Sequence, residues 1–180
     1  MKNLSFLFLL LMGLGLTSCS SNLTPFTQNL YDQNNWSERD LSKIQFYLSH
    51  DIVLRRDAGG SSSNIRDGKI RVVNGREVEE VIFPAGTPGV LIDVPRENRF
   101  AVSFEEDNNN FLLFGEGRKS GGRYVVLAKN WNKRIGNVKY KGKNWSIDTN
   151  SAYASLLVDI KKARKVIRKS ESVSGRRIDD

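Results

Sequence analysis

Cysteine and histidine, two residue types that serve nucleophilic and acid–base chemistry, occur once each in this chain, as Cys19 and His50. His50 is followed by Asp51, and a histidine beside a carboxylate is one part of a Ser-His-Asp arrangement. However, no serine lies in the Gly-x-Ser-x-Gly context that exposes a nucleophile at a strand–helix turn. We interpret His50 as a capping group at the end of a helix, and a hydrolase as the least favoured function.

Metal and phosphate sites are equally weakly indicated. His50 has no second histidine or cysteine with which to hold zinc. Residues 105–109 offer carboxylate and amide oxygens, but they lack the glycine and the closing glutamate of a calcium loop. The glycine-rich residues 115–123 lack the Gly-x-x-x-x-Gly-Lys-Ser spacing of a phosphate loop. The sequence therefore predicts no enzyme, no metal and no cofactor.

Cys19 ends an apolar N-terminal run. Lys2 supplies a positive charge, residues 4–16 are almost entirely apolar, and two small residues precede the cysteine, which is the pattern of a secretory signal. The run is shorter than the ~20 residues that span a bilayer. The stretch Leu16-Thr17-Ser18-Cys19 resembles the lipobox of bacterial lipoproteins. A plain secreted protein with an incidental cysteine is the alternative.

The lipobox resemblance implies a division of the chain. Residues 1–18 would be a signal peptide, Cys19 the site of lipid attachment, 19–30 a lipidated tether, and 31–180 one β-rich periplasmic domain. Two or three acyl chains hold a protein firmly at a membrane. No acidic residue follows Cys19 closely. By analogy with lipoprotein sorting, this favours the outer membrane with the domain facing the periplasm.

The charge of the chain limits its partners. Its formal net charge is +8, which bears on partners rather than on fold. An exported, anchored chain meets anionic lipid headgroups, lipopolysaccharide phosphates or acidic wall polymers, and not nucleic acid. We expect a non-enzymatic binding or assembly component of an envelope protein complex, or alternatively a peptidoglycan-binding module. The alternative without a function is a solvated basic surface that has no specific partner.

Two basic clusters are candidate contact surfaces. One lies in the glycine-rich loop and contains Arg118 and Lys119. The other surrounds Trp131 and contains Lys129, Lys133 and Arg134. We favour the second, because an aromatic ring adds contact area that a bare charged loop lacks. A short strand separates the clusters, so we expect them at its opposite ends, with at most one beside any ligand. A tryptophan that closes one end of a barrel is the structural alternative.

Strand patterns dominate after residue 51. A helix is expected first, from a Ser37 N-cap with Leu41, Ile44 and Leu48 on one face. Short strands with polar turns follow. The Asn74-Gly75 pair suits a type I′ hairpin, and residues 138–147 form a further hairpin that brings Tyr140 near Trp145.

Residues 81–94 and 100–105 resemble a small SH3-like barrel, in which an apolar strand enters a Gly-Thr-x-Gly bend (residues 86–89). Together with the regular spacing of short strands, the resemblance predicts a mainly β fold, a small barrel or sandwich, with one N-terminal helix.

The C-terminal segment fits two patterns. Residues 153–169 place apolar side chains on one helical face and basic ones on the other, but residues 156–161 also alternate as a strand does. We favour strands here because the preceding segments are β, and we expect a closing strand at 173–178.

Overall fold

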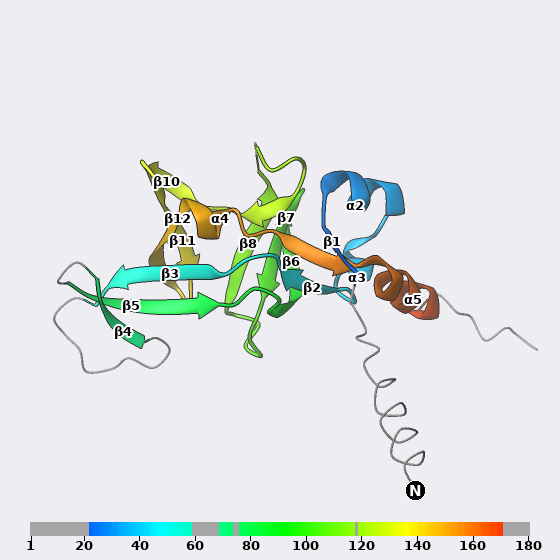
Figure 1. Ribbon diagram of the computed structural model, residues 1–180. Coiled ribbons are helices and arrows are strands. Elements are labelled where there is room, and N and C mark those ends of the chain that lie inside the picture. The colour runs from blue at the N-terminus through cyan, green and yellow to red at the C-terminus, as the bar shows by residue number, and fades with distance from the viewer. Residues whose placement is uncertain (1–21, 59–68, 74–75, 118, 171–180) are drawn as a thin grey trace, which may run out of the picture.

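The computed structural model describes residues 22–58, 69–73, 76–117 and 119–170, which form two antiparallel sheets and a few short helices (Figure 1). The mainly β class is therefore confirmed. The first sheet has the order β1-β13-β2-β6-β7-β8-β9 and the second the order β10-β11-β12-β3-β5-β4. The strands of the first sheet are β1 (Leu23–Pro25), β2 (Gln45–Leu48), β6 (Pro88–Arg96), β7 (Arg99–Ser103), β8 (Phe111–Glu116), β9 (Tyr124–Val126) and β13 (Leu156–Asp159). Those of the second are β3 (Ile52–Asp57), β4 (Lys69–Val73), β5 (Arg76–Phe83), β10 (Lys129–Asn132), β11 (Ile135–Tyr140) and β12 (Lys143–Asp148).

The chain passes from one sheet to the other twice at one corner, formed by residues 49–51 and 84–87. Strand β2 pairs with β6 in the first sheet, whereas their continuations β3 and β5 pair in the second. The Gly86 N–H donates to the Leu48 carbonyl at 2.7 Å, and the Leu48 N–H donates to the Thr87 carbonyl at 3.2 Å. Gly86 has a φ of +78°, a conformation that glycine adopts without steric cost. The corner therefore depends on a glycine at this position.

Of the two expected forms, barrel or sandwich, the barrel is wrong, because among the described residues no ladder of paired strands joins the two ends of the first sheet. Strand β9 approaches the other end through two isolated bridges, Thr27 with Arg123 and Val125 with Ser155, and through a hydrogen bond from the Tyr124 N–H to the Phe26 carbonyl. The SH3-like stretch is divided by the corner: β5 belongs to the second sheet and β6 to the first. Local strand patterns suit both arrangements, and the turn at Gly86 decides between them.

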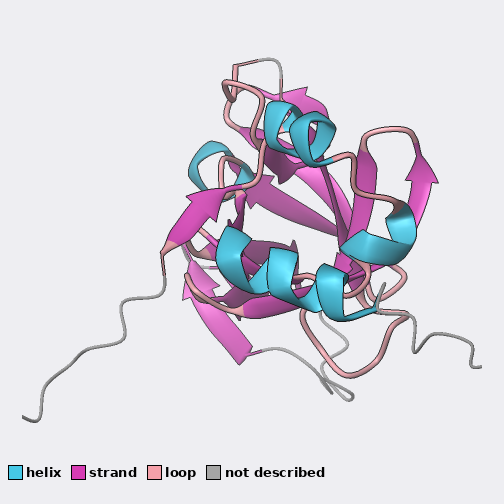
Figure 2. Cartoon of the chain, turned by 90° about the vertical axis from the view of Figure 1, so that its right-hand side faces the viewer, coloured by secondary structure: helices cyan, strands magenta, loops and turns pink. Residues whose placement is uncertain are grey.

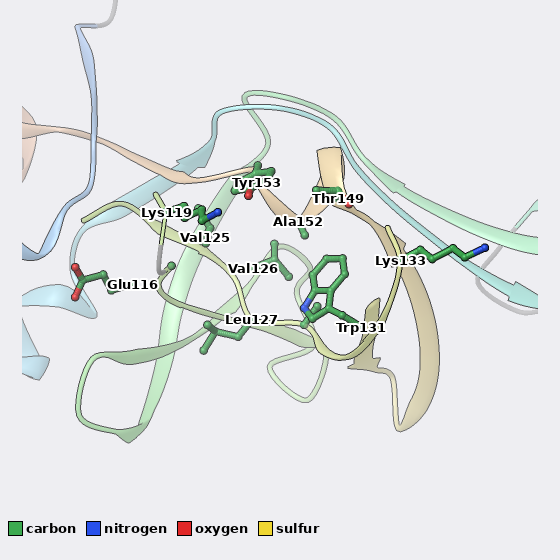
Figure 3. Close-up of a pocket in the computed structure, with 12 residues that line it drawn as sticks. Glu116, Lys119, Val125, Val126, Leu127, Trp131, Lys133, Thr149, Ala152 and Tyr153 are labelled. Atoms are coloured by element: carbon green, nitrogen blue, oxygen red, sulfur yellow. The ribbon is translucent and has the colours of Figure 1, made fainter. Parts of the chain in front are cut away.

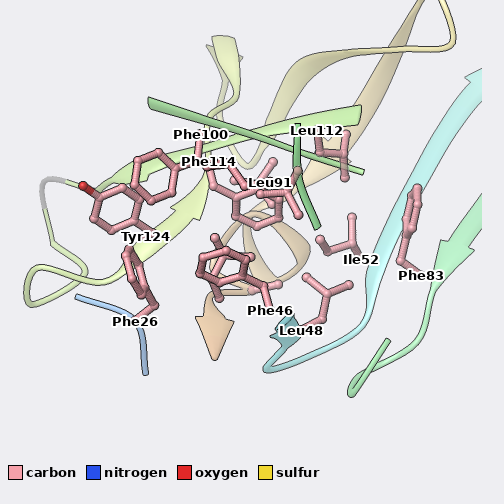
Figure 4. Packing of buried hydrophobic residues seen from close by; sticks show 14 of the residues in the cluster. Phe26, Phe46, Leu48, Ile52, Phe83, Leu91, Phe100, Leu112, Phe114 and Tyr124 are labelled. Carbon is pink, nitrogen blue, oxygen red and sulfur yellow. The ribbon is translucent and has the colours of Figure 1, made fainter. Parts of the chain in front are cut away.

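An aromatic cluster fills the core of the first sheet (Figure 4). Phe26 is completely buried, and its ring lies 5.2 Å from that of Phe46 and 5.0 Å from that of Tyr124, both edge-on. Trp36 stacks on Phe26 with an interplanar angle of 10°. The Tyr124 hydroxyl donates to the Gln28 side chain at 2.5 Å, and burial raises the pKa of Tyr124 above its usual value. The residues just after β1 thus belong to the core.

The helices are α2 (Gln28–Asn34), α3 (Glu38–Leu41), α4 (Thr149–Ala152) and α5 (Ile160–Ser170) (Figure 2). The predicted Ser37 N-cap is confirmed, with a reciprocal capping box to Asp40. The expected helix ends at Leu41, however, and Leu48 lies on strand β2 instead. Along β2 the buried Phe46 and Leu48 alternate with more exposed neighbours, which is a strand pattern. Pairing with β13 and β6 on its two sides satisfies the backbone of this segment.

The preference for strands at the C-terminus is right for β13 and wrong beyond it, where residues 160–170 form α5. The Asp159 carboxylate accepts the Lys162 N–H at 3.1 Å at the start of the helix, and Ala163 and Ile167 are buried on one face. The expected strand at 173–178 lies outside the described residues.

Other expectations concern hairpins and the N-terminus. The β4–β5 hairpin is confirmed by the pairing of Val73 with Arg76, although the Asn74-Gly75 turn lies outside the described residues. The hairpin of β11 and β12 is also confirmed. Cys19 and the signal segment lie outside the described residues. Residues 23–30, expected to be tether, contain β1 and the first part of α2. No helix of the described part is long and apolar enough to cross a bilayer.

Candidate binding groove

A hollow of about 810 Å³ opens beside β9, β10 and α4, and we call it the β9 groove (Figure 3). Its floor is apolar, formed by Val125, Val126, Leu127, Ala128 and Ala152. Two half-exposed aromatic side chains and several charged ones stand around this floor: Trp131, Tyr153, Glu116, Lys119 and Lys133. An apolar surface with a few polar groups at its margin is typical of a binding site.

Trp131 lies on the exposed edge strand β10, and 46% of its surface is accessible. This exposure fits the contact-surface interpretation of Trp131 and not the alternative of a tryptophan that closes one end of a barrel. A Cβ atom on Gly136 would lie 2.9 Å from the Trp131 ring and 3.0 Å from the Ala128 side chain. The indole therefore lies directly against Gly136. Only a residue without a side chain at position 136 leaves room for this ring.

Tyr153 stands at the end of α4 and is 53% exposed. The backbone N–H and the hydroxyl of Thr149 each donate to the Arg134 carbonyl at 3.0 Å. These bonds tie α4 to the turn between β10 and β11. The Asp148 carboxylate caps the helix by accepting the Ser151 N–H at 2.8 Å. Trp131 and Tyr153 are thus held by elements that are bonded to each other.

Ser120 organises the glycine-rich loop at the other end of the groove. Its hydroxyl lies 2.9 Å from the Gly117 carbonyl and 2.7 Å from the Arg123 carbonyl, and Ser120 is 9% exposed. The Gly122 carbonyl accepts the Gln28 N–H at 2.9 Å, so the loop is also attached to α2. Lys119 is thereby placed at the margin of the groove.

Each of the two basic clusters contributes one lysine to the same hollow, although we expected the clusters to lie apart at opposite ends of the strand. Lys119 from the loop and Lys133 from the tryptophan cluster both line the β9 groove. Strand β9 has three residues and spans only about 10 Å, so its two ends flank the same hollow. In Figure 3 the Lys133 side chain extends outward from the groove.

The tryptophan cluster itself is divided among three hollows. Lys129 lines a neighbouring hollow of about 540 Å³ together with Phe111 and Tyr140. Arg134 lines a third, of about 510 Å³, formed by the β10–β11 turn. Arg118 lies outside the described residues. Of the candidate contact residues, Trp131, Lys133 and Lys119 therefore share a site.

Sequence reasoning missed Tyr153, Glu116 and the floor of the groove. The sequence places Tyr153 at the start of a segment for which strands are favoured, whereas in the structure it directly follows the short helix α4. No local pattern marks these residues as neighbours, because they come together only through the placement of β9 beside α4.

His50 does not cap a helix, which corrects the sequence interpretation. It is exposed in the turn between β2 and β3, where its Nδ1 lies 2.9 Å from the Ser49 hydroxyl. The Asp51 carboxylate instead accepts the Ala85 N–H at 2.7 Å and supports the corner. The Ser49 hydroxyl accepts the Ser155 N–H at 2.8 Å. These three side chains thus bind the corner and the β13 segment and do not form a Ser-His-Asp relay.

Two buried carboxylates, Glu79 and Glu80, are consecutive residues of β5 and therefore point to opposite faces of the sheet. Arg55 Nε lies 2.7 Å from a Glu80 oxygen, and Arg56 pairs with Glu79 across the same strands. The Arg56 guanidinium also lies 5.2 Å from the ring of Trp145, which is buried as expected. Among the described residues no group of three or more His, Cys, Asp or Glu could hold a metal ion.

Comparisons with protein-family models, with curated proteins and with solved structures found no match for this chain.

Proposed function

We propose that this chain is a lipid-anchored component of the bacterial envelope, held through Cys19 at the outer membrane and facing the periplasm, that binds a partner protein without catalysing a reaction. The observation that carries the binding role is the β9 groove, where two half-exposed aromatic rings stand over an apolar floor. Exposed tryptophan and tyrosine side chains on firm supports commonly anchor protein interfaces.

The charge of the groove indicates the chemistry of its partner. Lys119 and Lys133 stand at its margin against one carboxylate, Glu116, and the whole chain has a formal net charge of +8. Complementary charge steers association and selects partners. The occupant we propose is a segment of an envelope protein that carries acidic and apolar side chains.

Peptidoglycan is the second candidate, because the same two aromatic rings could stack on sugar rings and the lysines could contact the carboxylates of peptide stems. The arrangement of Trp131 and Tyr153 around one hollow supports the binding of peptidoglycan as well as it supports the binding of a peptide. The two candidates differ in the material that would be bound.

The anchor is tested by Cys19→Ser. Metabolic labelling with palmitate should label the wild-type chain and not the variant, which should stay uncleaved or be released into the periplasm. A wild-type chain that takes up no label, with a mature N-terminus elsewhere, would exclude the lipid anchor.

The groove is tested by a photo-crosslinking phenylalanine derivative in place of Tyr153, in cells that express the full chain. We expect a discrete adduct with an acidic envelope protein, lost in a Trp131→Ala background. Ile135→Ala is the matched control, because Ile135 is also 46% exposed but lies outside the groove.

Three results are distinguishable in this experiment. A discrete protein adduct that depends on Trp131 supports the protein partner. Adducts that are digested by a muramidase, with Trp131-dependent sedimentation on purified peptidoglycan, support the wall-binding candidate. Equal adducts in the Trp131 and Ile135 variants, or none in the wild-type background, would overturn the assignment of the β9 groove as the binding site.

A further inference from the structure

We infer that the exposed face of α5 docks on anionic lipid headgroups of the membrane in which the chain is anchored. This inference goes beyond partner binding at the β9 groove and rests on the lipid anchor of the proposed function. It is carried by the charge of the helix and by its place in the fold.

The exposed face of α5 is basic. Lys161, Lys165 and Arg168 lie at intervals of four and three residues, which places them in one row along a helix. All three are exposed, and the buried Ala163 and Ile167 occupy the opposite face. We call Lys161, Lys165 and Arg168 the basic row.

The basic row differs from its neighbours on α5 in its ion pairing. Lys162 approaches the Asp159 carboxylate at 3.7 Å, and Arg164 Nε donates to the Asn34 side chain at 3.3 Å. Among the described residues, by contrast, the structure shows no ion-pair partner for any member of the basic row. Charges that the fold itself does not pair are available to an external anionic surface.

The start of the fold places this helix near the anchor. Leu23, the first residue of β1, pairs with Asp159, the residue immediately before α5. Cys19 precedes Leu23 by four residues, and four residues span at most about 14 Å when fully extended. Figure 1 shows α5 beside β1 and α3 at one end of the molecule. A lipid on Cys19 would therefore hold α5 close to the bilayer surface.

The charges act on the membrane only when α5 comes within about 8 Å of its surface, the Debye length at physiological ionic strength. A helix that starts beside the residue paired with Leu23 can come that close, because four residues connect Leu23 to Cys19. Each Lys or Arg brought close to an anionic bilayer strengthens attraction roughly fivefold. Val166, 41% exposed, lies on the side of α5 between the basic row and the buried face.

Docking through α5 would also orient the groove. Strand β10 and α4, which carry Trp131 and lead to Tyr153, lie toward the opposite end of the molecule from α5 (Figure 1). The groove would then face away from the bilayer, where a periplasmic partner can reach it.

A single labelled position tests the inference. The purified lipidated chain carries Val166→Cys with a fluorescent thiol label and is reconstituted into vesicles that contain a headgroup-linked quencher. In vesicles with about 30% phosphatidylglycerol we expect the label to be quenched severalfold more than in pure phosphatidylcholine, and about 0.5 M salt should remove the difference. The same label at Asn144→Cys, on the second sheet, should be quenched in neither kind of vesicle.

Charge variants distinguish docking by the basic row from an effect of the net positive charge of the chain. Replacing the basic row by alanines should abolish the extra quenching in anionic vesicles. The matched control replaces three exposed lysines of the second sheet, Lys129, Lys139 and Lys143, by alanines and should retain it. Equal loss in both triple variants would overturn the inference, because it would show an effect of net charge alone.

Flotation of the vesicles reports the anchor independently. A chain that floats with neutral vesicles but shows no quenching preference for anionic ones keeps its anchor and refutes docking by α5. A chain that fails to float with neutral vesicles has no anchor. Quenching after anionic vesicles are added to that free chain then still decides the question: its presence supports a lipid-binding α5, and its absence refutes it.

Discussion

Phe26→Ala should cost this protein a large part of its stability. The Phe26 ring is completely buried and lies within 6.3 Å, centroid to centroid, of five other aromatic rings. Truncating a buried phenylalanine to alanine costs about 3–5 kcal/mol of unfolding free energy. Total stabilities are about 5–15 kcal/mol, so the variant loses about a fifth or more. Its melting temperature should fall by about 10 °C, since each kcal/mol shifts a chain of this size by about 2–4 °C.

The backbone at Phe26 isolates the contribution of the ring. Its N–H donates to the Leu156 carbonyl at 2.8 Å and its carbonyl accepts the Tyr124 N–H at 3.2 Å, and alanine can keep both bonds. Phe111→Ala is the control, because Phe111 is 36% exposed and its truncation should cost about 1 kcal/mol or less. Urea and thermal unfolding measure both variants. Equal stabilities of the two would refute the view that the segment after β1 is part of the core.

Three further outcomes follow from particular contacts. Gly86→Val should lower the unfolding free energy by about 1–3 kcal/mol through its positive φ, and Gly86→Asn by clearly less; similar losses would mean that the turn is not strained. Gly136→Val should displace the Trp131 ring, shift its fluorescence and weaken partner crosslinking, whereas unchanged emission would contradict the packing of the indole on Gly136. Burial raises the pKa of Tyr124, so above about pH 10 the unfolded chain loses this proton first and stability falls as pH rises. Tyr124→Phe should flatten the fall in urea unfolding between about pH 9 and 11, and an unchanged slope would assign it to other groups.

Local chemistry made several elements predictable. The Ser37 cap depends on an acidic side chain three residues later, and the β4–β5 and β11–β12 hairpins depend on alternating strands joined by short turns. Such features arise between residues close together in the sequence, so the residues themselves report them.

The errors concern segments with two compatible patterns. Residues 42–48 have both helical and strand periodicity, and β2 forms because β13 and β6 lie on either side of it. Residues 156–161 also fit both, and the chain becomes a helix after Asp159, where β13 ends and one face can be buried. The free energy that decides these cases comes from contacts with distant strands, and local propensity is too weak to override it.

The sequence by itself determined the β class, the local turns, the basic charge and the lipobox-like stretch that ends at Cys19. Only the tertiary structure decided that the sheets stay open, that the chain turns between them at Gly86, and that Lys119, Trp131 and Tyr153 share one groove. It also placed the basic α5 beside the first strand. These are relations between residues far apart in the chain, and they exist only once strand pairing and burial have brought those residues together.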